Sequence, residues 1–214
     1  SPSVLRPAGA AVLWKRWRLL EGTELYDLDS DPRQQNNVGD QYPNVAEKML
    51  VHLDNCWKEV EPIANEPQRI TIGHQAENPM MLSACEWWDV FVDQQRQVRI
   101  GERKNSYWHL HVARAGTYTF ELRRWPRESK LKLTDACPAA EVTDGDLCRG
   151  VALPISRARL FIGGEWHQKP VEPDDDSATF SVDLEPGPVR LHTWFDDERN
   201  QPLCGAYYVY VKRA

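Results

Sequence analysis

Two clusters of tryptophan and arginine contain the side chains of this sequence best suited to recognise a ligand. Trp87 and Trp88 are adjacent, so in an extended strand their rings face opposite sides and only one can join a one-sided core. Arg123 and Arg124 directly precede Trp125. An exposed indole can stack on a sugar face, and a guanidinium can pair with a sulfate or a carboxylate. We therefore take these five residues as candidate glycan or sulfate contacts, with burial in a core or an interface as the alternative for most of the tryptophans.

Metal binding is the chemistry that the histidines and the acidic runs suggest. His109 and His111 alternate along one expected strand and could approach one metal, but no third ligand is visible, so a polar outer sheet face is the favoured interpretation. The runs "DLDSD" and "DDD" lack the spaced pattern of a calcium loop, which needs about six to eight oxygens around one point. We predict solvated turns there and no metal site.

Catalytic motifs are missing from the sequence. There is no Gly-x-Ser-x-Gly elbow, no glycine-rich phosphate loop before a helix, and no cysteine with an evident histidine partner. The five cysteines form no CxxC pair, which argues against zinc. Cys137 and Cys148 flank a short loop and could form a disulfide, and the alternative is that all five are small buried hydrophobes. We expect no catalytic residue in this chain.

Composition and charge narrow the class of partner. The chain has 214 residues, of which 41% are apolar and 27% charged, as in an ordinary soluble protein, although nine tryptophans is a high number. The net charge of −6 argues against nucleic acid and against an anionic membrane surface. No run reaches the roughly 20 apolar residues that span a bilayer, and residues 1–17 lack the pattern of a signal peptide. The sequence itself assigns no compartment.

The first 66 residues indicate a small α+β domain. Short apolar runs at residues 10–14, 17–20 and 24–28 predict three antiparallel strands. A helix should begin at Pro43 and end at about residue 61, because proline is tolerated in the first turn of a helix and apolar residues then recur at helical spacing. Its apolar positions are Val45, Met49, Leu53, Trp57 and Val60. Pro62 and Pro67 should end the helix and form a linker.

Residues 67–214 indicate an all-β domain. The clearest pair of strands lies in "SYWHLHVARAGTYTFELRRW", and further pairs are expected from "ARLFI" through Gly163 and Gly164, from "ATFSVDL" into "VRLHTWF", and from that strand to "AYYVYVKR". About eight strands at this spacing predict an antiparallel sandwich, jelly-roll-like, as an accessory domain.

Residues 10 to 62 carry a set of motifs in a characteristic order. They include Trp17-Arg18-Leu19, Glu24-Leu25-Tyr26-Asp27-Leu28, Asp31-Pro32, Gln34-Gln35, Asn36-Asn37-Val38, Pro43-Asn44-Val45-Ala46 and Trp57. This segment, one quarter of the chain, resembles the C-terminal subdomain of arylsulfatase-type, formylglycine-dependent bacterial sulfatases. The remainder is similar, more weakly, to a β-sandwich that follows this subdomain in some of them.

The resemblance implies a parent enzyme whose catalytic parts are missing here. Sulfatases hydrolyse sulfate esters with a formylglycine made from Cys or Ser in a Cys/Ser-x-Pro/Ala-x-Arg motif, assisted by a calcium ion. No such motif occurs in this sequence, and "SRARL" at Ser156 fails at its fifth position. The resemblance thus implies no cofactor in this fragment, calcium and formylglycine in the parent, and a periplasmic or secreted location.

Three interpretations of function follow. The first is a non-catalytic C-terminal part of a sulfatase, which packs on the catalytic domain of the same polypeptide and shapes its substrate cleft. The second is a carbohydrate-binding module for sulfated glycans. The third is an oligomerisation domain that forms a homo-oligomer. In the stretch "ELYDLDSDPRQQNNV", residues 24–38, the acidic and amide side chains are expected to satisfy the backbone of a turn.

Overall fold

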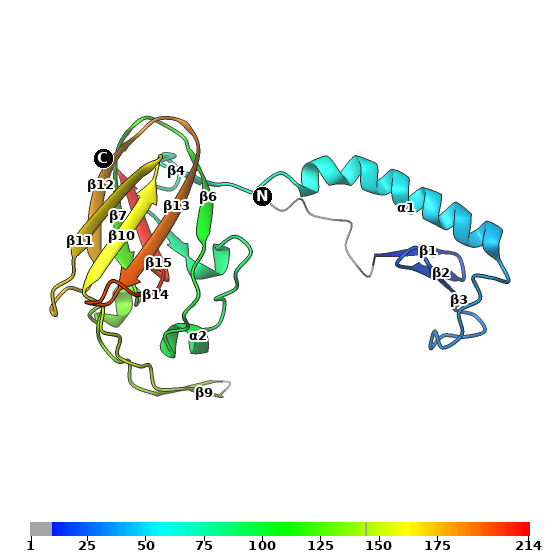
Figure 1. Cartoon of the computed structure of the whole chain (residues 1–214), viewed down its shortest axis with the longest axis horizontal. Helices are drawn as coiled ribbons and strands as arrows, with labels where there is room; N and C mark the ends of the chain where they lie inside the picture. Colours follow the sequence, from blue (N-terminus) through cyan, green and yellow to red (C-terminus); the bar gives the residue numbers. More distant parts are fainter. Residues whose placement is uncertain (1–9, 144) are drawn as a thin grey trace. The chain divides into compact units, whose positions relative to one another are not determined.

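The computed structural model describes residues 10–143 and 145–214. The chain forms two compact units, Ser1–Pro67 and Gln68–Ala214, each of which has its own hydrophobic core. No helix in the described part of the chain is long and apolar enough to cross a membrane. Figure 1 shows the order of the elements, and each unit is described by itself.

The first unit is a three-stranded antiparallel sheet with one long helix. The strands β1 (Ala11–Trp14), β2 (Trp17–Leu20) and β3 (Glu24–Asp27) lie in the order β1-β2-β3, which confirms the predicted strands. Helix α1 spans Pro43–Ala64 and ends three residues later than expected. The buried side chains that form the core come from both the sheet and the helix: Val12, Trp17, Leu19, Leu25 and Met49.

The late end of α1 corrects the expectation that Pro62 stops the helix. Pro62 lies in the last turn of α1. A proline removes one backbone hydrogen bond and is costly in the middle of a helix, but here only two more residues follow before the helix ends. The helix therefore runs through Pro62 and stops at Ala64.

The acidic connector between β3 and α1 is a hydrogen-bonded turn. The Asp31 carboxylate accepts hydrogen bonds from the backbone N–H groups of Gln35 and Asn36, at 2.7 and 2.8 Å. The Asn37 side-chain oxygen accepts from the N–H groups of Leu25 and Gly39, at 3.1 and 2.9 Å. These side chains satisfy the backbone of the turn, as the sequence predicts.

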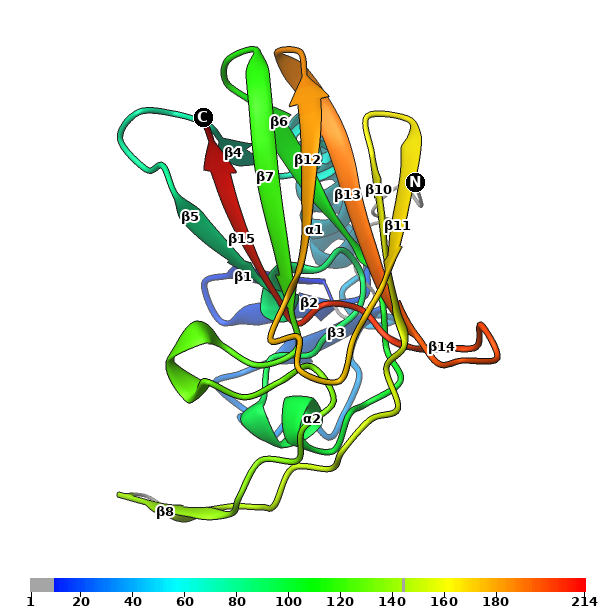
Figure 2. The same cartoon turned by 90° about the vertical axis from the view of Figure 1, so that its left-hand side faces the viewer.

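The second unit is a β-sandwich of two sheets (Figure 2). One sheet has the strand order β12-β7-β15-β5, and the other has the order β11-β10-β13-β6-β4, with β14 paired to β13. The bounds are β4 Ile70–Ile72, β5 Met80–Ser83, β6 Tyr107–Val112, β7 Gly116–Arg123, β10 Arg157–Ile162, β11 Glu165–Pro170, β12 Ala178–Leu184, β13 Gly187–Asp196, β14 Pro202–Cys204 and β15 Tyr208–Arg213. A separate hairpin joins β8 (Ala140–Val142) and β9 (Gly145–Leu147).

Alternating side chains from both sheets fill the space between them. Along β12 every second residue is buried, beginning with Ala178 and ending with Leu184. Tyr118 and Phe120 of one sheet and Trp108 and Phe195 of the other have no exposed surface. Because one face of each sheet is buried in this way, the other face of each sheet is left to solvent or to a ligand.

The partners of most strands differ from the predicted ones. Strands β6 and β7 are consecutive, but β6 pairs with β13 and β4, whereas β7 pairs with β12 and β15. Strands β12, β13 and β15 likewise alternate between the two sheets. Alternating apolar residues predict that a segment is a strand, but they do not predict which strand it pairs with. In this unit short loops cross from one sheet to the other, so consecutive strands often lie in different sheets. The predicted hairpin through Gly163 and Gly164 does form, and both glycines have positive φ, at 62° and 87°.

Three smaller features depart from an all-antiparallel sandwich. Strand β4 pairs with β6 in parallel. A short helix α2 (Gln95–Arg99) and two 3-10 turns, η1 (Ala84–Glu86) and η2 (Arg127–Ser129), lie where the sequence predicts only strands and loops. Cys137 and Cys148 are both free thiols, so the disulfide considered for them is absent.

Candidate functional site

The two tryptophans Trp87 and Trp125, predicted to contact a glycan, are buried. Trp87 is 4% exposed and packs against Trp108 and Tyr207, with ring centroids 5.6 and 6.0 Å away. Trp125 is 3% exposed, and its indole N–H donates to the carbonyl of Asp135 at 3.2 Å. Neither ring has a free face on which a sugar could stack, so we do not retain them as candidate contacts.

Arg124 is a buried structural cation. Its side chain has no exposed surface and donates to the backbone carbonyls of Asp135 and Val151, at 3.0 and 2.6 Å. Its guanidinium also lies 4.5 Å from the centre of the Trp125 ring. Burial lowers the pKa of this guanidinium. The hydrogen bonds join the end of β7 to two loops, which is a role in folding and leaves no room for a sulfate.

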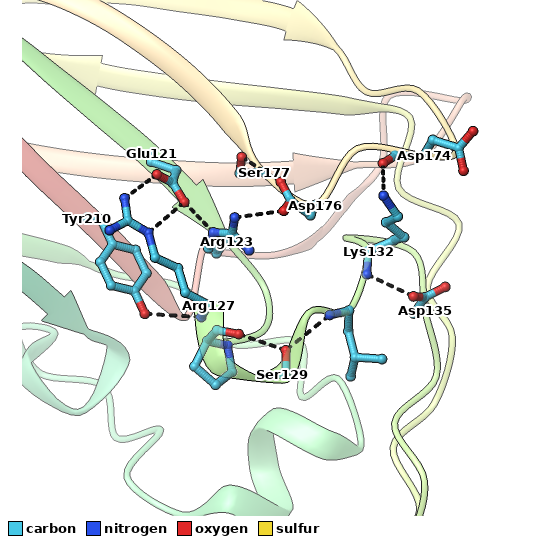
Figure 3. A network of polar contacts seen from close by, with 12 residues as sticks. Glu121, Arg123, Arg127, Ser129, Lys132, Asp135, Asp174, Asp176, Ser177 and Tyr210 are labelled. Carbon is cyan, nitrogen blue, oxygen red and sulfur yellow. Dashed lines mark hydrogen bonds and ion pairs between the residues drawn. The ribbon is translucent and has the colours of Figure 1, made fainter.

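Arg123, the last residue of β7, belongs to a network of ion pairs on the sheet β12-β7-β15-β5 (Figure 3). It contacts the carboxylates of Glu121 and Asp176, the latter at 2.9 Å, and Glu121 also pairs with Arg127. Although burial opposes ionisation, hydrogen bonds from Arg127 and Arg123 hold the pKa of Glu121 below its ordinary value. The positive charge of Arg123 is thus balanced by protein carboxylates, and its side chain is 8% exposed.

Trp88 differs from the other four candidates because it is half-buried and lies beside strand β6. Its backbone N–H donates to the carbonyl of Tyr107 at 2.9 Å. Its ring meets the His109 ring edge-on, with centroids 4.9 Å apart and an angle of 88°. The two neighbouring tryptophans Trp87 and Trp88 therefore divide as the sequence predicts: one joins the core and the other lies at the sheet surface.

The outer surface of the sheet beside Trp88 carries a continuous group of aromatic side chains. Directly opposite residues of neighbouring strands share a face. Phe161 of β10 lies opposite Trp166 of β11 and His192 of β13, and His192 lies opposite Tyr107 of β6. We call the following set the aromatic face: Trp88, Tyr107, His109, Phe161, Trp166, His192 and Trp194.

The rings of the aromatic face contact one another across four strands. Trp166 lies 5.1 Å from Phe161 and 4.9 Å from Trp194, measured between ring centroids. Trp194 lies 3.7 Å from His192, which in turn lies 6.1 Å from Tyr107. Trp166 is 59% exposed. Mutual contacts hold the rings in place while the indole of Trp166 stays open to solvent.

A buried carboxylate fixes two arginines next to these rings. Asp196, which has no exposed surface, accepts hydrogen bonds from Arg157 at 3.0 and 2.7 Å and from Arg159 at 2.6 and 2.8 Å. Arg159 lies over the rings of Trp194 and Trp166, at 4.9 and 5.8 Å from the centroids. Although burial opposes ionisation, these hydrogen bonds lower the pKa of Asp196.

The two histidines of the aromatic face are neutral at pH 7. Burial, with the nearby Arg159 guanidinium, lowers the pKa of His192 to about 4. Burial and the positive charges of Arg190 and Arg69 lower the pKa of His109. Nε2 of each ring is buried without a hydrogen-bond partner among the described residues, as is Nε1 of Trp88. The face thus combines flat apolar rings with a few polar atoms.

Metal binding, considered above for the histidines and the acidic runs, has no matching group of ligands in the described part of the chain. No group of three or more His, Cys, Asp or Glu side chains that could hold a metal ion occurs among residues 10–143 and 145–214. His109 and His111 lie on one face of β6, but His109 is buried and His111 is exposed.

Trp166 and Trp194, the central rings of the aromatic face, are not among the five residues proposed from the sequence. Two signals in the sequence could have identified them. In "LHTWF" the residues Leu191, Thr193 and Phe195 follow the buried phase, so Trp194 must point outward. The glycine pair at 163 and 164 fixes the hairpin register that places Trp166 opposite Phe161.

No protein-family model matches this chain, and no curated protein matches it significantly. Among solved structures it is similar to a family 35 carbohydrate-binding module from Clostridium thermocellum, at 13% identity and a TM-score of 0.33, over 62% of this chain and 98% of that chain. It is also similar to a ruminal GH26 endo-beta-1,4-mannanase, at 14% identity and a TM-score of 0.32, over 64% of this chain and only 26% of that chain. These likenesses are too distant to assign a ligand.

Proposed function

We propose that the second unit binds carbohydrate through the aromatic face. The observation that carries the proposal is the exposed ring of Trp166, held by contacts to Phe161 and Trp194 on a rigid sheet. Flat rings that are fixed before binding lose little conformational entropy when a sugar stacks on them. A strand surface also holds such rings more accurately than a flexible loop would.

The histidines of the face contribute packing to the proposed site. The Nε2 atoms of His192 and His109 are buried beneath their neighbours, so a sugar hydroxyl on the surface does not reach them in this arrangement. Stacking on the exposed ring of Trp166 is therefore the contact on which the proposal rests.

We further propose that the glycan is anionic, which includes the sulfated glycans considered from the sequence. Three arginines, Arg157, Arg159 and Arg190, lie along the outward phase of β10 and β13, and one buried carboxylate, Asp196, accompanies them. A local excess of positive charge on a chain with net charge −6 favours an anionic ligand over a neutral one.

The first unit supports a second proposal, that this chain is the non-catalytic C-terminal part of a sulfatase. The support is the ordered set of motifs from Trp17 to Trp57 together with the small sheet and helix that these residues form. The parent protein would hydrolyse sulfate esters with calcium and formylglycine in its catalytic domain. Isolation of the parent gene tests this, because an upstream domain without a Cys/Ser-x-Pro/Ala-x-Arg motif would contradict it.

Affinity electrophoresis of the whole chain tests carbohydrate binding. The gels contain neutral or sulfated polysaccharides, and agarose and carrageenan provide a galactan backbone without and with sulfate. We expect retention by at least one of them. Trp166→Ala should weaken that retention by at least about tenfold, because a central stacking ring contributes about 1.4 kcal/mol or more.

Trp14→Ala is the matched control. Trp14 is 41% exposed and lies on β1, in the sheet of the first unit, whereas the aromatic face belongs to the second unit. It should leave retention unchanged. Equal retention of wild type, Trp166→Ala and Trp194→Ala on every polysaccharide that binds would contradict the proposal.

A further inference from the structure

Arg190 is a cation beside the aromatic face that has no carboxylate partner in the described part of the chain. It is an exposed residue of β13, directly opposite His109 of β6, and its guanidinium lies 5.1 Å from the centre of the Tyr107 ring. It forms no ion pair or hydrogen bond with any residue in the described part of the chain other than those of the strand ladder. Its donors are therefore free to bind a ligand.

The other two arginines are already occupied. Arg157 and Arg159 donate four hydrogen bonds to the Asp196 carboxylate. Part of their charge is balanced by Asp196, and their Nε and Nη2 groups are engaged. Arg159 lies over the Trp194 ring, so its main effect is to position that ring. Arg190 alone of the three combines an exposed charge with a flat platform beneath it.

The spacing along β13 sets the size of the ligand. Arg190 and Trp194 are four residues apart on the same side of the strand, with His192 between them. At a rise of about 3.3 Å per residue, their Cα atoms lie roughly 13 Å apart. One monosaccharide is too small to contact both side chains.

We propose that Arg190 recognises an anionic substituent, a sulfate ester or a carboxylate, on an oligosaccharide whose neighbouring sugar stacks on Trp166 and Trp194. This inference rests on the proposed carbohydrate binding and adds the residue that determines selectivity for charge. The guanidinium, which lies over the Tyr107 ring, presents a planar fork of donors that suits both anions. Monosaccharide sulfates would lack the length to use both parts of the site.

Three derivatives of one backbone test the inference on the whole chain: hydroxyethylcellulose, carboxymethylcellulose and cellulose sulfate. Wild type should bind at least one charged derivative more tightly than the neutral one. Arg190→Gln should weaken binding to that derivative by about tenfold to a hundredfold, as expected for a charge-assisted hydrogen bond, and leave binding to hydroxyethylcellulose unchanged. Arg190→Lys should keep part of the preference, because it keeps the charge and loses the fork.

Arg149→Gln is the charge-matched control, because Arg149 is exposed and follows β9, outside the two sandwich sheets. It should bind all three polymers like wild type. A loss confined to cellulose sulfate identifies a sulfate, and a loss confined to carboxymethylcellulose identifies a carboxylate; both support the inference.

The role of Arg190 is overturned if Arg190→Gln retains the full preference for charged polymers, or if wild type has no such preference. These outcomes are distinct from failure of carbohydrate binding itself. In that case wild type would bind none of the three derivatives and neither galactan, or Trp166→Ala would bind them all normally.

Discussion

Arg159 binds the carboxylate of Asp196 through Nε and Nη2, at 2.6 and 2.8 Å, while its guanidinium lies 4.9 Å from the centre of the Trp194 ring. A two-point contact fixes the plane of the guanidinium, because rotation would break one of the hydrogen bonds. The Trp194 ring lies under a guanidinium that is held in this way. Asp196, which is buried, thus positions the arginine that lies over a ring of the aromatic face.

Removal of the Asp196 charge should weaken both the fold and the binding face. Asp196→Asn leaves Arg157 and Arg159 without their anionic partner, so we expect the free energy of unfolding to fall by about 3 kcal/mol. Unfolding by guanidinium chloride measures this loss. Carbohydrate retention should fall in the same variant under conditions where it is still folded, since Trp194 is no longer held.

Glu185→Gln provides the control for Asp196→Asn, because Glu185 is an exposed residue in the turn between β12 and β13. It should change the unfolding midpoint very little. A midpoint for Asp196→Asn equal to that of Glu185→Gln would mean that the buried ion pairs do not stabilise the sandwich.

Mutation of Trp125 should cost much more stability than mutation of Trp166. Trp125 is buried under the backbone of Gly150, where its ring leaves no room for even a Cβ atom, so Trp125→Ala should cost about 3–5 kcal/mol of stability. Trp166→Ala should cost less than about 1 kcal/mol, because this residue is already 59% exposed. Urea unfolding of both variants tests the contrast. Equal losses would show that the assignment of one ring to the core and the other to the surface is wrong.

The stability of the folded chain should decrease as the pH falls, because of His192. The folded chain lowers the pKa of His192 to about 4 from its ordinary value of 6.5. Between about pH 6.5 and pH 4 the unfolded chain therefore binds a proton that the folded chain does not, so the stabilisation is complete above pH 6.5 and is lost as the pH falls through this window. We expect thermal unfolding of wild type to shift to lower temperature across the window.

His192→Gln isolates this effect from that of the carboxylates. Asp196 and Glu121 also have lowered pKa values, so their stabilising ion pairs are lost as the pH falls further. The variant keeps these carboxylates but lacks the titrating ring, and its melting temperature should change less than that of wild type between pH 6.5 and pH 4.5. Parallel pH profiles would mean that His192 titrates alike in both states.

The strands could be predicted from the sequence, and most of their partners could not. Alternation of apolar residues in "TYTFEL" or "ATFSVDL" reports a one-sided strand. Pairing is set by loops that cross between sheets, such as the three residues between Val112 and Gly116, and such loops have no distinctive pattern. The Gly163 and Gly164 hairpin is the exception because its turn demands positive φ at both positions.

The site was less predictable than the fold, for a related reason. A tryptophan next to a turn can point either way, and Trp125 and Trp166 both lie near turns. Whether such a ring is buried or exposed depends on the sheet face toward which it points and on its neighbour in the adjacent strand. Both are properties of the folded sheet. The pair Arg123 and Arg124 also looked free in sequence, but Glu121, Asp176 and two backbone carbonyls, brought close only by folding, occupy them.

The indole N–H signals of the chain test the location of the carbohydrate site most directly. The nine tryptophans should give nine indole signals in a ¹⁵N–¹H spectrum, and Trp→Phe variants would assign them. During titration with oligosaccharides cut from carrageenan or cellulose sulfate, the signals of Trp166 and Trp194 should shift, and those of Trp14 and Trp57 in the first unit should not. Saturation by the oligosaccharide without any shift at Trp166 or Trp194 would contradict carbohydrate binding by the aromatic face.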